Sequence, residues 1–224
     1  YMKIMLQKKV DGIILVGSVF REKSDNRHIY DAALHVPLVM LNGSLDGNNI
    51  FPIVCDDETG IYKAVELLYS RGHREMVYLY DVDSFSGMAK IRGFERGMKD
   101  MGLTLNSGSI IKVSPGIMGG YEGVEILDRK GIRYTAVLTS EDIIAAGVLN
   151  KLKETGKEVP RDVAVIGYNN SQVSLCTAPE LSTVDNKVEK MAVGAVRILY
   201  DVLEGKDVQP KMMVTPDLVV RGSC

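Results

Sequence analysis

The segment Val159-Pro160-Arg161-Asp162-Val163-Ala164-Val165-Ile166-Gly167-Tyr168-Asn169-Asn170 decides the fold of this chain. Pro160 ends a helical pattern, and the apolar run that follows is typical of a strand buried on both faces of a parallel sheet. In such sheets, ligands bind just beyond the carboxyl ends of the strands. Asn169 and Asn170 are therefore predicted to lie at the edge of a binding site. The alternative is that both are turn residues, because asparagine tolerates left-handed backbone.

Strand and helix patterns alternate through all 224 residues. The first ten residues read as the second half of an amphipathic helix, and the glycines of 116–120 read as a loop. This alternation predicts an α/β fold with parallel sheets covered by helices. The expected strands and extended segments are 13–16, 37–41, 51–55, 76–80, 110–113, 136–139, 163–166, 181–184 and 212–220, and the expected helices are 59–70, 89–101, 120–129, 143–154 and 188–203.

Composition narrows the functional class. The net charge is −2 and hydrophobic residues make up 46% of the chain, both ordinary values for a globular protein. A basic excess typical of nucleic-acid binding is absent, so these residues are not expected to hold DNA themselves. Cys55, Cys176 and Cys224 lie far apart without zinc-ligand spacing, and no apolar run reaches membrane-spanning length. We expect no metal, no cofactor and no membrane contact.

Short polar residues follow nearly every expected strand: Ser18, Asn42, Asp56, Glu141 and Asn169. The carboxyl ends of parallel strands meet at one edge of a sheet, so these side chains are predicted to gather there. An edge lined by small hydrogen-bonding groups suits a polar small molecule. The alternative is that the same residues cap the helices that follow, and both can hold together.

Catalytic patterns are weak. His28 lies in an expected polar loop, His35 precedes Pro37, and His73 reads as a turn residue. No nucleophile elbow or phosphate-binding glycine loop occurs. Asp56-Asp57-Glu58 could be paired carboxylates or a metal site, but a helix N-terminus also attracts carboxylates, and we favour that interpretation. The residues alone indicate a binding module and not an enzyme.

Several segments, in order, resemble the effector-binding core of the lactose/purine-repressor (LacI–GalR) family of transcription regulators. Each is weak alone, and the ordered set is specific and covers nearly the whole chain. The matching segments are Val10-Asp11-Gly12-Ile13-Ile14-Leu15, Asp56-Asp57-Glu58-Thr59-Gly60, Arg71-Gly72-His73-Arg74, Arg92-Gly93-Phe94, Asp142 with Ala145-Ala146-Gly147, Val159 to Tyr168, and Ala178-Pro179-Glu180-Leu181-Ser182-Thr183-Val184.

The resemblance implies a periplasmic-binding-protein-like α/β fold with two parallel-sheet lobes, helices on both faces and a ligand cleft between them. Residues 1–73 and 185–214 would form an incomplete N-terminal lobe, and 74–184 and 215–224 the C-terminal lobe. The chain would cross between the lobes near 73–75, 183–186 and 215–216. The family's DNA-binding head and first strand–helix unit are expected to have been removed upstream.

The resemblance also implies ligand-binding positions, each carried over singly. Lys90 stands where the family has a ligand-binding arginine, and lysine cannot form arginine's planar bidentate contact. A contact between Lys90 and Asp56 is expected across the cleft. Glu141 and Asn169 replace the family's asparagine and aspartate. The full set of expected ligand residues is Asp56, Lys90, Glu141 and Asn169, with Ser18 and Ser86 as weaker candidates.

The expected partners follow from the same resemblance. The first is a small-molecule effector, which we expect to be a carbohydrate. The second is another copy of the chain, bound through the helix from Ala146 to Glu154 and the loop from Val173 to Ala178. Operator DNA would be bound only through the missing helix-turn-helix, in the cytoplasm. Two alternatives stay open: a solute-binding protein of a sugar transporter, and a sugar-modifying enzyme that uses Asp56 and Glu141 as an acid–base pair.

Overall fold

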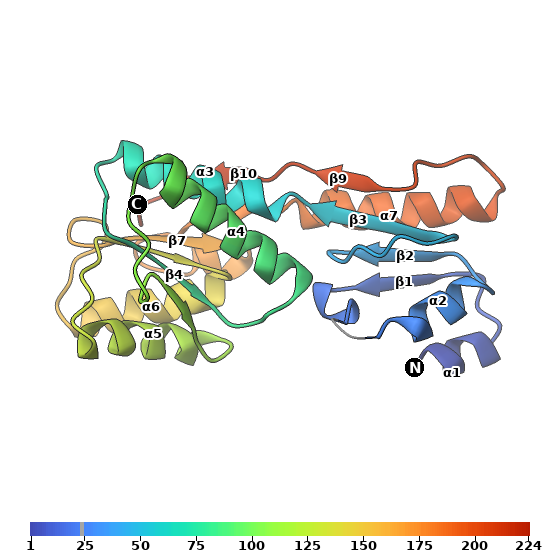
Figure 1. Cartoon of the computed structure of the whole chain (residues 1–224), viewed down its shortest axis with the longest axis horizontal. Helices are drawn as coiled ribbons and strands as arrows, with labels where there is room; N and C mark the ends of the chain where they lie inside the picture. Colours follow the sequence, from blue (N-terminus) through green and yellow to red (C-terminus); the bar gives the residue numbers. More distant parts are fainter. Residues whose placement is uncertain (23–24) are drawn as a thin grey trace. The chain divides into compact units, whose positions relative to one another are not determined.

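The computed structural model describes residues 1–22 and 25–224, which form two compact units (Figure 1). The first unit contains Tyr1–Cys55, Ser84–Ser86 and Lys187–Val214. The second contains Asp56–Asp83, Gly87–Asn186 and Thr215–Cys224. Both units are helix-covered sheets, as expected for a periplasmic-binding-protein-like α/β fold.

The first unit is built on a parallel sheet of order β1-β2-β3-β9. Buried side chains of β1 and β2 pack against α1 and α2, and those of β2, β3 and β9 pack against α7. Figure 1 shows these helices on opposite sides of the sheet. The elements are α1 (Met2–Gln7), β1 (Ile13–Val16), α2 (Arg27–Ala33), β2 (Leu38–Leu41), β3 (Ile50–Cys55), α7 (Val188–Leu203) and β9 (Met212–Val214).

The second unit has a sheet of order β10-β8-β7-β6-β4-β5, in which only the β10–β8 pair is antiparallel among the described pairs. Its carboxyl edge carries the loops that follow β4, β6, β7 and β8. Its elements are α3 (Asp57–Ser70), β4 (Met76–Tyr80), α4 (Phe85–Asp100), β5 (Ile110–Lys112), α5 (Ile117–Arg129), β6 (Ala136–Thr139), α6 (Asp142–Glu154), β7 (Ala164–Tyr168), β8 (Ser182–Asp185) and β10 (Asp217–Val219).

Both faces of this second sheet are buried. Val77 and Leu79 pack among residues of α5 and α6, whereas Met76 and Tyr78 pack among residues of α3 and α4. Successive residues of a strand point to opposite faces, so β4 must be apolar throughout to be covered on both sides. This explains why the strands of this unit read as unbroken apolar runs in the sequence.

The helix α3 packs within the second unit. Ile61, Val65 and Leu68 lie in one buried cluster with Phe94 and Tyr168. The predicted lobe boundary at residue 73 places this helix in the other lobe, whereas the compact units change between Cys55 and Asp56. The apolar face of α3 decides its place, because it is covered by strands and helices that follow it in the chain.

The helix α5 begins at Ile117, so the prediction of a loop over 116–120 was wrong beyond Gly116. Glycine is a poor helix former, which is why the sequence suggested a loop. Packing explains the glycines: a Cβ on Gly120 would lie 2.2 Å from the Ile144 carbonyl oxygen, and one on Gly147 would lie 2.0 Å from that of Ile117. Bare backbones let α5 and α6 cross in direct contact.

Other helix boundaries also differ from the prediction. The helix α2 was not predicted, and it contains His28, which the sequence placed in a loop. The helix α4 starts at Phe85, four residues before the expected start at Ala89. The first turns of α2 and α4 were missed because the helical spacing of apolar residues, from which helices are predicted, begins only inside each helix.

The C-terminal residues are joined to the second sheet. The Val165 amide donates to the Ser223 carbonyl at 2.8 Å, and the Ser223 hydroxyl donates to the Val165 carbonyl at 2.6 Å. The Ser182 amide donates to the Ser223 hydroxyl at 2.8 Å. Arg221 donates to the Leu181 carbonyl at 2.7 Å. The last residues therefore complete the hydrogen bonding of β7 and β8.

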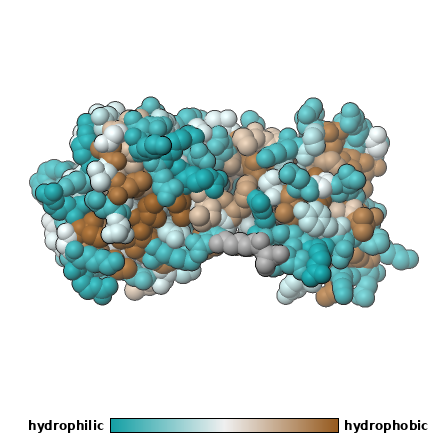
Figure 2. Space-filling model, in the orientation of Figure 1, coloured by the Kyte–Doolittle hydropathy of each residue, from teal (hydrophilic) through white to brown (hydrophobic). Residues whose placement is uncertain are grey.

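Hydrophobic and hydrophilic residues are mixed over the face that Figure 2 presents. Scattered exposed apolar side chains are normal for a protein surface. Within the described part of the chain, no helix has both the length and the apolar character needed to cross a bilayer.

Candidate functional site

Polar side chains lie at the carboxyl edge of the second sheet. Of the five strand-end residues predicted to gather at one edge, only Glu141 and Asn169 lie here. Ser18, Asn42 and Asp56 come after β1, β2 and β3, because the strands form two sheets. Asp81 follows β4, Ser140 and Glu141 follow β6, and Asn169 follows β7. Asn186 follows β8. The sequence prediction included Glu141 and Asn169 but missed the other three. Asp81 directly follows an apolar strand, so the same rule could have identified it.

Lys90 lies on α4 and is 6% exposed. Its Nζ donates to the Ser140 carbonyl oxygen at 3.0 Å and lies 3.8 Å from the ring centroid of Tyr168. A carbonyl oxygen and an aromatic face both stabilise a cation. The Tyr168 hydroxyl donates in turn to the Asp57 carboxylate. Lys90 is therefore held at the strand-end edge by residues of β6 and β7.

Two carboxylates lie close together beside Lys90. The Ser140 hydroxyl donates to Asp81 Oδ1 at 3.0 Å, and Glu141 is the next residue. Burial raises the pKa of the Glu141 carboxyl, the nearby Lys90 opposes this, and the charges of Asp81 and Asp142 raise it further. The Lys90 ammonium and the two aspartates therefore act on Glu141 in opposite directions.

Asp142 is buried and fixes two neighbouring loops. Its carboxylate accepts from the Ser171 amide at 2.7 Å, from the Ser171 hydroxyl at 2.9 Å and from the Thr183 hydroxyl at 2.5 Å. Burial raises its pKa, and these hydrogen bonds oppose the shift. A Cβ on Gly167 would lie 2.3 Å from Asp142 Oδ1, so only glycine leaves room for this carboxylate. The contacts of Asp142 are structural.

Asn169 and Asn170 form the turn after β7, with φ angles of 103° and 50°. The alternative that they are turn residues is confirmed for the backbone. Asn169 Oδ1 accepts from Asn186 Nδ2 at 2.9 Å, and Asn170 Oδ1 accepts from Arg221 at 2.7 Å. Asn170 is thereby held by the C-terminal segment. Ligand binding by Asn169 stays a prediction.

Tyr78 contributes a polar group that was not among the residues predicted from the sequence. Its ring stacks on Tyr80 and Phe94, and its buried hydroxyl has no hydrogen-bond partner among the described residues. Burial raises its pKa well above the ordinary tyrosine value, and the charges of Asp57, Asp81 and Glu141 raise it further. The hydroxyl therefore lies near the carboxylates of this edge.

Asp56 is the N-cap of α3, Asp57 and Glu58 are its first residues, and the three have separate partners. Asp57 accepts from the Tyr168 hydroxyl. Asp56 accepts from the Thr59 amide at 3.1 Å and caps the helix, as the favoured interpretation expected. Glu58 forms ion pairs with Arg92 and Arg96. The described residues contain no cluster of three or more acidic, histidine or cysteine side chains suited to a metal ion. The expected contact between Asp56 and Lys90 is not seen, because each side chain bonds elsewhere.

Ser18 and Ser86 belong to the first compact unit. The Ser18 hydroxyl donates to the Ser84 hydroxyl at 2.9 Å, and Ser86 is 9% exposed. Asn42 ends β2 in the same unit, with a φ of 59°. Ligand contacts by Ser18 and Ser86 stay predictions.

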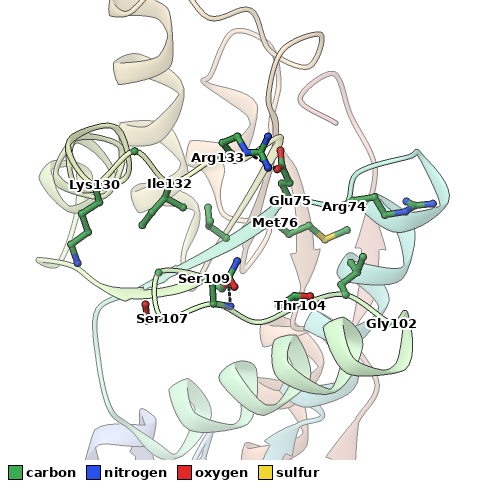
Figure 3. Close-up of a pocket in the computed structure, with 15 residues that line it drawn as sticks. Arg74, Glu75, Met76, Gly102, Thr104, Ser107, Ser109, Lys130, Ile132 and Arg133 are labelled. Carbon is green, nitrogen blue, oxygen red and sulfur yellow. Dashed lines mark hydrogen bonds and ion pairs between the residues drawn. The ribbon is translucent and has the colours of Figure 1, made fainter.

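A pocket of about 820 Å³ opens at the opposite, amino edge of the second sheet (Figure 3). Arg133 and Glu75 form an ion pair at 3.1 Å across part of it, and Arg74 points away. Arg74 instead stacks on Tyr69 and donates to its carbonyl oxygen. Arg133 and Glu75 of this pocket thus pair with each other, and ligands of parallel sheets bind at the carboxyl ends of the strands, so the carboxyl edge is the stronger candidate site.

Comparison with known proteins identifies the family. The model of the periplasmic binding protein-like domain matches residues 65–224. An HTH-type transcriptional regulator of Lachnoclostridium phytofermentans is 38% identical over 224 residues, which cover 99% of this chain and 67% of that protein. The chain belongs to the LacI–GalR family of transcriptional regulators. The PurR repressor of Vibrio atlanticus is 26% identical and is covered to the same 67%.

Solved structures of LacI-family proteins agree in fold. A sugar-binding LacI-family regulator from Escherichia coli, solved with phosphate, superposes with a TM-score of 0.88 at 28% identity, covering 100% of this chain and 80% of that one. The Escherichia coli repressor AscG superposes with a TM-score of 0.86 at 28% identity, covering 100% and 81%. The periplasmic-binding-protein-like fold is therefore confirmed.

These relatives decide between the functional classes left open by the sequence. They are LacI-family transcriptional regulators and repressors, which favours a regulator core over a transporter's solute-binding protein. None of these names describes an enzyme. The chain spans about two thirds of the length of the first two relatives, and it corresponds to the effector-binding core of LacI-type regulators.

Proposed function

We propose that this LacI-family core senses a carbohydrate at the carboxyl edge of its second sheet, in the cytoplasm. The observation that carries the proposal is the buried Lys90 ammonium at the strand ends. It is held on the carbonyl oxygen of Ser140, the residue that bonds to Asp81 and precedes Glu141. Sugar hydroxyls both donate and accept hydrogen bonds, so they match an edge with one ammonium and two carboxylates. The sugar-binding regulator from Escherichia coli supports this ligand class.

In this proposal Lys90, Glu141 and Asn169 contact the effector, and Asp56, Ser18 and Ser86 are additional contacts. Asp142, Asn170 and Arg221 hold the loops in place through the hydrogen bonds described above. The effector would bind two states of the regulator with different affinity, because a ligand with equal affinity for both shifts nothing. Operator DNA would be bound by the family's helix-turn-helix.

The test is effector binding by Lys90→Ala. A lost charge-assisted hydrogen bond costs about 1.5–3 kcal/mol, so we expect affinity to fall by roughly ten- to a hundredfold. Isothermal titration calorimetry against a panel of neutral mono- and disaccharides measures this. The matched control is Lys153→Ala, an exposed residue at the end of α6. Unchanged affinity in Lys90→Ala would exclude Lys90 from the site.

A further inference from the structure

We infer that the effector carries a protonated amine, bound by Asp81 and Glu141, as in an amino sugar. This inference rests on the proposed function and names the ligand class of the same edge. Its first basis is geometric. The strands β4 and β6 are paired with Leu79 opposite Thr139, so Asp81 and Glu141 both lie two residues beyond adjacent strand positions, and the Ser140 hydroxyl donates to Asp81 at 3.0 Å.

The second basis is that nearby cations are already engaged. The ammonium of Lys90 lies on the Ser140 carbonyl oxygen and the Tyr168 ring, and that of Lys112 pairs with Asp83. In the part of the chain that the structure describes, no ion pair joins Asp81 or Glu141 to either lysine. Both carboxylates are only partly exposed. A ligand ammonium would therefore form direct ion pairs with Asp81 and Glu141 that neither lysine forms, while the charge of Lys90 acts on Glu141 without a direct contact.

The third basis is the Tyr78 hydroxyl, which is independent of the acidic pair. It is fully buried, lacks a hydrogen-bond partner among the described residues and lies near Asp81 and Glu141. An unpaired buried hydroxyl costs free energy, so it is expected where a bound group supplies the missing interaction. A hydroxyl both donates and accepts, so it can bond to a ligand hydroxyl or to a ligand ammonium.

The alternatives in ligand charge fit less well. An anionic ligand would be repelled by the two carboxylates, because contacts between like charges are unfavourable. A metal ion is not favoured, because the described residues contain no cluster of three or more ligands suited to one. Burial and Asp81 both raise the pKa of Glu141, and a bound cation would relieve both effects. An organic amine is therefore the favoured ligand class.

The experiment compares matched sugars on the 224-residue chain by calorimetry at neutral pH. Glucosamine, galactosamine and mannosamine are each compared with the parent hexose, the N-acetyl derivative and the hexose 6-phosphate. We expect at least one hexosamine to bind about tenfold or more tightly than its parent and its N-acetyl form, as a charge-assisted hydrogen bond predicts. The corresponding phosphate should not bind.

Variants of the two carboxylates test whether they cause the preference for an amine. Glu141→Gln and Asp81→Asn should each remove the preference for the amine, whereas Glu66→Gln, exposed on α3, should keep it. Circular dichroism melting verifies that each variant folds. If hexoses bind as well as hexosamines, or if both variants keep the preference, the inference is overturned and the proposed function stands. If no sugar binds, both fail.

Discussion

The burial of the Lys90 ammonium indicates a role in ligand binding. Its ammonium is bonded by one carbonyl oxygen and one aromatic ring, and it is 6% exposed. A buried charge costs free energy even when it is partly compensated, and an apolar side chain in its place is often neutral or stabilising. A buried lysine at the strand ends is therefore better explained by a role in ligand binding than by a contribution to folding stability.

Glu141 gives a prediction about pH. Its folded-state pKa is raised above the ordinary 4.5, chiefly by burial, with Asp81 and Asp142 adding to the shift and Lys90 opposing it. Between the two pKa values the folded state binds more protons, so stability falls as pH rises through the folded pKa. Glu141→Gln removes this loss.

We expect Glu141→Gln to raise the free energy of unfolding at neutral pH by up to about 1 kcal/mol, since solvent screens a partly exposed charge. The gain should vanish at pH values below 4.5, where the carboxyl is protonated in both states. Urea unfolding at several pH values measures it, with Glu66→Gln as control. A stabilisation that persists at acid pH would contradict the assigned cause.

The sequence predicted some site residues and could not predict others. Glu141 and Asn169 were accessible because they directly follow strands, and Asp81 follows the same rule. Tyr78 was not accessible, because it alternates with apolar residues inside β4 and its hydroxyl matters only through the carboxylates around it. The contacts of Lys90 likewise depend on β6 and β7, which lie far along the chain.

At the scale of elements, the apolar runs predicted the strands closely. The limits of β1, β4 and β6 and of the helix α7 match the expected ranges. The starts of α4 and α5 did not, because glycine-rich or polar residues open both helices. Helix propensity is a weak guide where tertiary packing selects small residues, as at the crossing of α5 and α6.

This crossing gives a prediction for Gly147→Ala. The added Cβ would lie 2.0 Å from the Ile117 carbonyl oxygen, so α5 and α6 must move apart. Overpacking of this kind costs about 1–3 kcal/mol, which exceeds the gain in helix propensity from glycine to alanine. Urea unfolding measures the loss, and Lys153→Ala on the exposed face of α6 is the control. An equally stable Gly147→Ala would show that the helices can separate freely.

At the scale of the whole molecule, we propose a homodimer formed through the helix from Ala146 to Glu154 and the loop from Val173 to Ala178. Leu175 in this loop is 57% exposed, so its side chain is available to pack against a partner. A second copy of the chain is the expected cover.

Leu175→Glu should shift the chain from dimer to monomer at micromolar concentration, because a buried interfacial charge without a partner is costly. Sedimentation velocity measures the change. Val193→Glu, at an exposed position on α7 in the first unit, is the matched control and should leave the dimer intact. A dimer that survives Leu175→Glu but not Val193→Glu would place the interface on α7.

The C-terminal segment has a practical consequence for engineering. Ser223 and Arg221 hydrogen-bond to β7, to the residues around β8 and to Asn170, so the end of the chain is part of the sheet that carries the candidate site. A reporter domain or purification tag that replaces the last few residues would remove these hydrogen bonds and distort the turn at Asn169. A fusion intended for a biosensor should therefore keep residues 221–224 unchanged.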